Sequence, residues 1–76
     1  MITVKYFASL KESLGRGQDT IEADSVFTVK DVWFKVADHT EHPTNLLVAV
    51  NKEYADMEHA IKDGDEVAFF PPVTGG

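Results

Sequence analysis

The residues with the clearest chemical potential are the last six, Pro71-Pro72-Val73-Thr74-Gly75-Gly76. Two prolines favour an extended backbone, and six residues at about 3.3 Å each carry the final carboxylate roughly 20 Å from a folded body. Because Gly75 and Gly76 lack a Cβ, the end fits a narrow channel and a second reactant can approach it from either side. Chance gives a Gly-Gly end to roughly one chain in two hundred. The segment therefore predicts delivery of a backbone carboxylate to a partner's active site.

Side chains elsewhere form no recognised catalytic arrangement. His39 and His42 lie three residues apart near a proline, which is not an established zinc spacing, and His59 stands alone. The sequence has no cysteine, so thiolate metal sites and a cysteine nucleophile are excluded. We expect no metal site and no side-chain catalysis, and any sulfur chemistry must use another atom.

Length and composition indicate one small domain. Seventy-six residues, of which 43% are apolar, can build one core but not two. The first eleven residues lack a signal-peptide pattern, and no stretch approaches the roughly 18 apolar residues of a membrane span. We expect a cytoplasmic protein with no membrane contact, since cysteine-free chains suit a reducing compartment.

The charge is unevenly distributed. Residues 1–37 carry five acids and five bases, whereas residues 38–76 carry eight acids and two lysines, so the net charge of −6 lies in the second half. An acidic half disfavours nucleic acid as a partner. It favours basic protein surfaces, or it serves only solubility.

The elements that position the tail begin with a strand and a short helix. Apolar residues alternate over 2–7, which predicts a strand with one buried face and Phe7 on the other. Residues 9–12 have the spacing of a capping box and Gly15 suits a left-handed stop, so we expect one or two helical turns. Residues 20–23 are predicted to return beside the first strand.

The main helix is predicted to begin at Thr28, a good N-cap, with Asp31 at the third helical position. Apolar residues follow at helical spacing, at Val29, Val32, Trp33 and Val36. Phe27 and Val32 form a candidate hydrophobic staple. This stripe requires a sheet to cover, and core packing explains it better than a ligand pocket.

The second half of the chain predicts further strands. Residues 38–45 read as a polar connection and residues 46–50 as a strand buried on both sides. Residues 52–62 are expected to hold a short strand, with Tyr54, Met57 and Ile61 facing inward or toward a partner.

The last predicted strand leads into the tail. A turn over residues 63–65 precedes a strand over 66–70, which Pro71 ends because proline cannot donate to a ladder. Alternation places Val67 and Phe69 in the core and Phe70 on the opposite face.

The end of the sequence resembles a known family. Residues 63–76, DGDEVAFFPPVTGG, are similar, nearly residue for residue, to the C-terminal block of the small subunit of molybdopterin synthase, a ubiquitin-like sulfur carrier. The first strand with Phe7 and the segment Val48-Ala49-Val50-Asn51 also look like that family, although the segment of residues 38–45 is shorter than the corresponding region of the family. The resemblance implies an α+β, ubiquitin-like β-grasp fold. It would have a mixed sheet of about five strands and one main helix over residues 1–70, with a flexible tail over 71–76.

The resemblance also implies a chemistry. An adenylating enzyme similar to ubiquitin-activating enzymes would use ATP to convert the Gly76 carboxylate into an acyl-adenylate, and a sulfur donor protein would then give a thiocarboxylate. A large catalytic subunit would transfer that sulfur to cyclic pyranopterin monophosphate to build the dithiolene of molybdopterin. The chain would act as the sulfur-donating subunit of a sulfurtransferase, in a heterotetramer of two small and two large subunits. It would hold no cofactor tightly.

Two outward aromatic residues and a third aromatic position suggest where partners bind. The predicted partner-binding residues are Phe7, Tyr54, Phe70, Pro71, Pro72, Val73 and Thr74. Aromatic anchors are common at the centres of interfaces, and ordinary core packing is the alternative for the three rings. The acidic turn over residues 63–66 either meets a basic partner or is simply solvated.

Three other functions remain open on the sequence. A thiamine-pathway sulfur carrier would share the fold, the Gly-Gly end and adenylation. A ubiquitin-like modifier would instead form an isopeptide bond through Gly76. A plain interaction module would not need the last two glycines.

Overall fold

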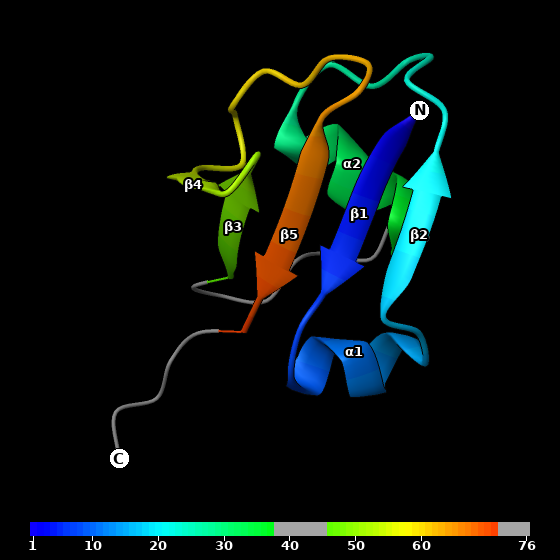
Figure 1. Ribbon diagram of the computed structural model, residues 1–76, viewed down its shortest axis with the longest axis vertical. Helices are drawn as coiled ribbons and strands as arrows, with labels where there is room; N and C mark the ends of the chain where they lie inside the picture. Colours follow the sequence, from blue (N-terminus) through cyan, green and yellow to red (C-terminus); the bar gives the residue numbers. More distant parts are fainter. Residues whose placement is uncertain (38–45, 72–76) are drawn as a thin grey trace.

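The computed structural model describes residues 1–37 and 46–71. The elements are β1 (Ile2–Tyr6), α1 (Ser9–Leu14), β2 (Gln18–Ile21), α2 (Val29–Val36), β3 (Leu47–Val50), β4 (Glu53–Ala55) and β5 (Glu66–Phe70). The strands form one sheet in the order β2-β1-β5-β3-β4. β1 and β5 are parallel neighbours at its centre, and the other pairs are antiparallel. In Figure 1, α2 lies behind the sheet and α1 lies at the end where β1 and β5 finish. The predicted mixed sheet of five strands with one main helix across it is confirmed.

The core lies between the sheet and α2. Alternation along β1 turns Ile2 and Val4 toward the helix, where both are fully buried. Val67 and Phe69 of β5, predicted in the core, are also fully buried. The Trp33 ring of α2 meets the Phe69 ring edge-on, with 5.1 Å between centroids. Removal of these side chains from water is the main source of the stability of so small a domain.

The start of α2 confirms one capping prediction and corrects another. Thr28 and Asp31 form a capping box, in which Asp31 N–H donates to Thr28 Oγ1 and Thr28 N–H donates to the Asp31 carboxylate. The predicted staple between Phe27 and Val32 is wrong, because the Phe27 side chain is 72% exposed. Backbone bonds to Asp31 and Ile61 fix residue 27, and this arrangement leaves its ring in solvent.

The capping box predicted over residues 9–12 is wrong. Ser9 is already the first residue of α1, and the N-cap is Ala8, at a φ of 54° and with no side-chain cap bond. The stop was predicted correctly, since Gly15 has a left-handed φ of 73°. β2 begins at Gln18, two residues before the predicted start, because Gln18 pairs with Lys5 in the register that β1 sets.

The strands of the second half lie close to their predicted positions. β3 begins one residue later than expected, and β5 has the predicted bounds. Ile61 is buried and Met57 packs against the core, as predicted. The polar connection predicted over residues 38–45 lies outside the described residues.

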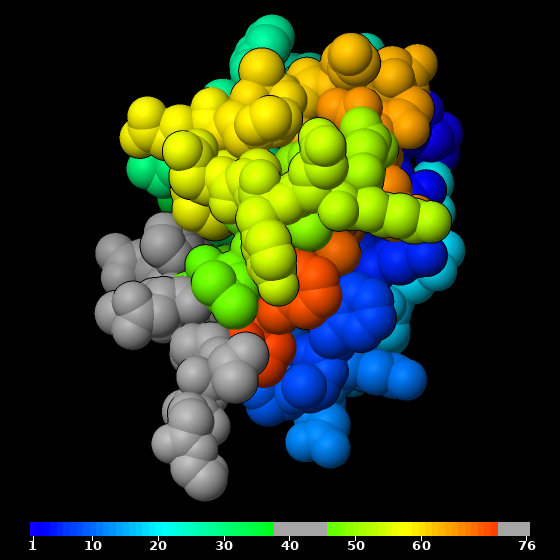
Figure 2. Space-filling model, turned by 60° about the vertical axis from the view of Figure 1, so that its left-hand side comes forward, coloured from blue at the N-terminus to red at the C-terminus, as the bar shows by residue number. Residues whose placement is uncertain are grey.

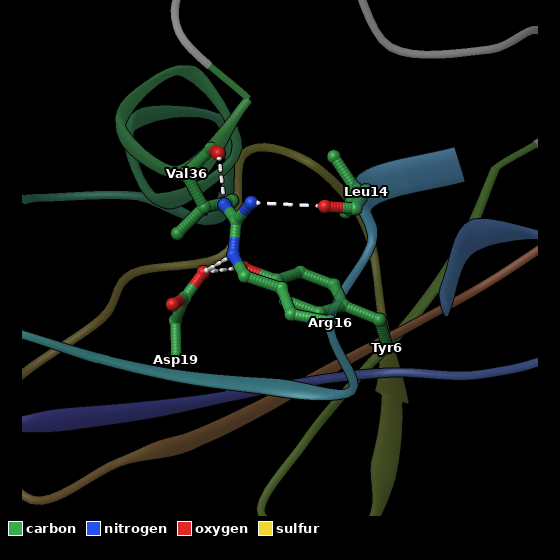
Figure 3. Close-up of polar contacts among 5 residues, drawn as sticks. All are labelled: Tyr6, Leu14, Arg16, Asp19 and Val36. Atoms are coloured by element: carbon green, nitrogen blue, oxygen red, sulfur yellow. Dashed lines mark hydrogen bonds and ion pairs between the residues drawn. The ribbon is translucent and has the colours of Figure 1, made fainter. Parts of the chain in front are cut away.

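One polar cluster ties α1, β1, β2 and α2 together (Figure 3). The Arg16 guanidinium donates to the carbonyls of Leu14 and Val36, at 3.2 and 2.7 Å, and pairs with Asp19 at 2.5 Å. The Tyr6 hydroxyl donates to the same Asp19 carboxylate at 2.8 Å. Burial, and then this bond to an acid, raises the pKa of the Tyr6 phenol. The cluster joins the end of α2 to the end of β1, where the candidate site begins.

Candidate functional site

An aromatic surface covers part of the sheet face that α2 leaves open. Phe70 of β5 points away from the core, and so does Phe7, which directly follows β1 and continues its alternation. The edge strand β4 adds Tyr54. The Phe7 and Phe70 rings stack with centroids 5.1 Å apart and planes 10° apart. Tyr54 lies 6.4 Å from Phe70 at 54°. We call Phe7, Tyr54 and Phe70 the aromatic surface.

This surface is accessible and slightly hollowed. Phe7 is 44% exposed and Tyr54 81% exposed, although both are large apolar rings that burial would stabilise. With the residues around them, they line a depression of about 390 Å³. Figure 2 shows side chains of β5 (orange) and β1 (blue) beneath the projecting chain of the β3–β4 hairpin (yellow-green). An exposed group of aromatic rings over a hollow is typical of a protein-binding surface.

Charged side chains rim the depression. Lys5 of β1 pairs with Glu66 of β5 at 3.4 Å, so these two charges compensate each other. Lys52 also lines the depression, and over residues 1–37 and 46–71 no ion pair involves it. The rim therefore carries one uncompensated positive charge in a chain whose net charge is −6.

Lys52 is held in an unusual backbone conformation. Val50 and Glu53 pair across the β3–β4 hairpin, so Asn51 and Lys52 form a two-residue turn. Their φ values are 51° and 70°, which is the pattern of a type I′ turn. Asparagine tolerates this left-handed region, but the second position favours glycine, and a lysine there costs backbone energy.

A buried carboxylate fixes the same turn to the start of β5. Asn51 donates to one oxygen of Asp65 at 3.0 Å, and the Lys62 N–H donates to the other at 2.9 Å. The Asn51 side-chain carbonyl in turn accepts from Glu66 N–H at 3.0 Å. Burial works against ionisation of Asp65, but the bonds from Asn51 and Lys62 outweigh it and lower the pKa of its carboxyl.

The acidic turn is thus only partly solvated. Asp65 is 6% exposed, so its assignment as a loosely solvated charge is wrong. Asp63 is exposed and pairs with the N-terminal ammonium of Met1.

The predicted site residues divide into two groups. Phe7, just after β1, is brought together with Tyr54 of β4 and Phe70 of β5, and the half-buried Pro71 directly follows β5. Residues 72–76, with both terminal glycines, lie outside the described residues, as do His39 and His42. In the part of the chain that the structure describes, no group of three or more histidine or acidic side chains is placed to hold a metal.

Sequence reasoning missed Lys52. The sequence feature that could have identified it is the pair Asn51-Lys52 between two short strands, because two residues in that place are typical of a type I′ turn.

Comparison with known proteins places the chain in a family. The profile of the ThiS family matches residues 4–76. The chain belongs to the ThiS family. Among curated relatives of this ThiS-family chain, the molybdopterin synthase sulfur carrier subunit of Escherichia coli is 39% identical, with all of both chains covered. The corresponding subunit of Haemophilus influenzae is 36% identical, again over the whole of both chains.

Solved structures confirm the fold of this ThiS-family chain. SAMP1 from Haloferax volcanii superposes with a TM-score of 0.82 at 30% identity, covering 99% of this chain and 98% of that one. The name SAMP1 stands for small archaeal modifier protein 1. The ubiquitin-like β-grasp fold predicted from the sequence is confirmed. None of the helices formed by residues 1–37 and 46–71 has the length and apolar character needed to cross a bilayer.

Proposed function

We propose that this chain is the sulfur-carrier subunit of a molybdopterin synthase. The observation that carries the proposal is the full-length match to relatives that bear that name, at 39% and 36% identity. The geometry supports it, because Phe70 of the aromatic surface is the last residue of β5 and only residues 71–74 separate it from the two terminal glycines. A partner that binds this surface would have residues 71–76 within reach of its own active site.

The proposed chemistry takes place on the Gly76 carboxyl carbon. A carboxylate is a poor electrophile, so a partner adenylating enzyme joins it to the α-phosphate of ATP and releases pyrophosphate. Hydrosulfide supplied by a sulfur donor protein attacks that carbon, the bond from the carbon to AMP breaks, and a thiocarboxylate remains. The thiocarboxylate sulfur then attacks a carbon of the pterin precursor and displaces an oxygen substituent from it. Water cleaves the bond between that sulfur and Gly76 and restores the carboxylate.

The protein body contributes position in this proposal. Holding a reacting group next to its target supplies a large part of a rate enhancement by itself. The basic and acidic groups that move protons would belong to the large subunit, and this chain would hold no cofactor. Two small and two large subunits in a cytoplasmic assembly complete the proposal, and the absence of cysteine fits a reducing compartment.

Intact-mass spectrometry tests the proposed chemistry. The chain is incubated with an adenylating enzyme, ATP and a sulfide source. We expect the mass change that corresponds to replacement of one oxygen by sulfur, dependent on ATP and absent from a variant that lacks Gly76. An unchanged mass with an active adenylating enzyme would refute the proposal.

A second function is favoured by one observation. The similarity to SAMP1, named as a modifier protein, at a TM-score of 0.82 supports a role as a ubiquitin-like protein modifier. The same acyl-adenylate would then react with a lysine amine instead of sulfur. Conjugates of higher mass, linked through Gly76 in cells, would favour this function, whereas a free thiocarboxylate favours the carrier. A thiamine-pathway carrier would also form the thiocarboxylate, but it would not bind the large subunit.

A further inference from the structure

We propose that the partner which docks on the aromatic surface presents a carboxylate at the edge of its contact area, and that Lys52 and Tyr54 bind it. This inference rests on the proposed function and specifies the chemistry of the docking partner. It concerns two side chains that line one depression with Phe70.

The first argument is the compensation of charge. Lys5 has its partner in Glu66, at 3.4 Å, whereas Lys52 has no ion pair among residues 1–37 and 46–71. When a partner covers the aromatic surface, the Lys52 ammonium at its rim loses water on one side. A charged group that loses water is destabilising unless an opposite charge replaces the lost contacts.

The second argument is the Tyr54 hydroxyl. The side chain is 81% exposed, and its hydroxyl makes no hydrogen bond within the part of the chain that the structure describes. A tyrosine in an interface buries its ring and needs an acceptor for its O–H. Because Lys52 and Tyr54 lie two residues apart at one end of the hairpin and line the same depression, one carboxylate with two oxygens can accept from both.

The third argument is the conformation of Lys52. A glycine would occupy the left-handed position, φ 70°, without strain. Strained residues persist where the surrounding structure holds them, and they concentrate at functional sites. The chain's net charge of −6 favours a basic partner overall, so this local acid would fix the orientation of docking instead of attracting the partner from a distance.

The test uses the full chain and the molybdopterin synthase large subunit of the same organism, with binding measured by calorimetry at low and high salt. Lys52→Gly removes the ammonium and relieves the turn, so we expect a melting temperature raised by about 4 °C or more. At the same time, the dissociation constant should rise about tenfold at low salt and depend less on salt. Tyr54→Phe should weaken binding about fivefold with an unchanged melting temperature.

Two control variants separate the possible outcomes. Lys30→Ala removes a charge from α2, on the opposite face, and should leave binding unchanged; an equal loss there would show a net-charge effect and overturn the inference. If Lys52→Gly binds like the wild type while Phe70→Ala binds weakly, the aromatic surface is the docking site but the proposed contact of Lys52 with a partner carboxylate is refuted. If Phe70→Ala also binds normally, or the wild type does not bind the large subunit, the proposed function itself fails.

Discussion

The substitution Phe70→Ala separates binding from folding at the aromatic surface. The Phe70 ring is half-buried and stacks on Phe7 at 5.1 Å. Truncating a fully buried phenylalanine costs about 3–5 kcal/mol, but most of that cost requires a cavity in the core. At Phe70 the loss is chiefly that of the aromatic pair, about 1 kcal/mol. For a domain of this size, that lowers the melting temperature by about 4–8 °C.

Binding should suffer more than stability. An aromatic anchor at the centre of an interface typically contributes 2 kcal/mol or more. We therefore expect the dissociation constant for the large subunit to rise about 30-fold. Calorimetric titration measures the binding, and thermal unfolding of the same samples measures the stability.

Two phenylalanines provide matched controls. Phe27→Ala removes an equally large ring that is 72% exposed and does not line the depression, so neither binding nor melting should change. Phe69→Ala removes a fully buried ring and should lower the melting temperature far more than Phe70→Ala does. If Phe70→Ala melts like Phe69→Ala and binds like the wild type, the ring belongs to the core and the reasoning is refuted.

Three other predictions concern the tail and the two polar networks. Deletion of Gly76 should leave the melting temperature unchanged within about 1 °C and abolish sulfur transfer in a reconstituted assay; residual transfer at the normal rate would contradict the proposed role. Because the pKa of Asp65 is lowered on folding, the folded state binds fewer protons than the unfolded state as this group titrates. The contribution of Asp65 to the free energy of unfolding is therefore complete above the unfolded pKa of about 4, and it disappears as the pH falls through the lower folded pKa. Urea unfolding at pH 7, 5 and 3 should show this loss of stability. The Asp65→Asn variant should be less stable by about 1–3 kcal/mol at pH 7, and its stability should depend less on pH. If its stability falls with pH in parallel with that of the wild type, other groups cause the loss. Arg16→Ala should lower the free energy of unfolding by about 1–2 kcal/mol. Arg16→Lys should restore only part of this stability, because an ammonium lacks the planar guanidinium that reaches Leu14, Val36 and Asp19. Full recovery with lysine would show that charge alone matters.

Local patterns predicted several elements well because their physical causes are local. Thr28 and Asp31 lie three residues apart, and both bonds of their capping box form within that short span. The strand over residues 66–70 is bounded by a turn and by Pro71, and its alternation placed Val67 and Phe69 in the core. The outward direction of Phe7 and Phe70, two of the three rings of the aromatic surface, followed from the same alternation.

Other features could not be read from local patterns. Alternation shows which face a residue occupies but not where pairing begins, so the start of β2 depended on its register with β1. The exposure of Phe27 depended on the distant residue Ile61, whose N–H donates to its carbonyl. The buried carboxylate of Asp65 required Asn51, fourteen positions away in the sequence.

The sequence by itself determined the β-grasp elements, the outward direction of two phenylalanines and the Gly-Gly end that carries the proposed chemistry. Those properties depend on alternation, caps and residue type, which act over a few neighbouring residues. The tertiary structure alone decided that Lys52 and Tyr54 lie beside Phe70 and that Asp65 is buried. The physical reason is that these contacts join segments far apart in the chain, and only the packing of the sheet brings those segments together.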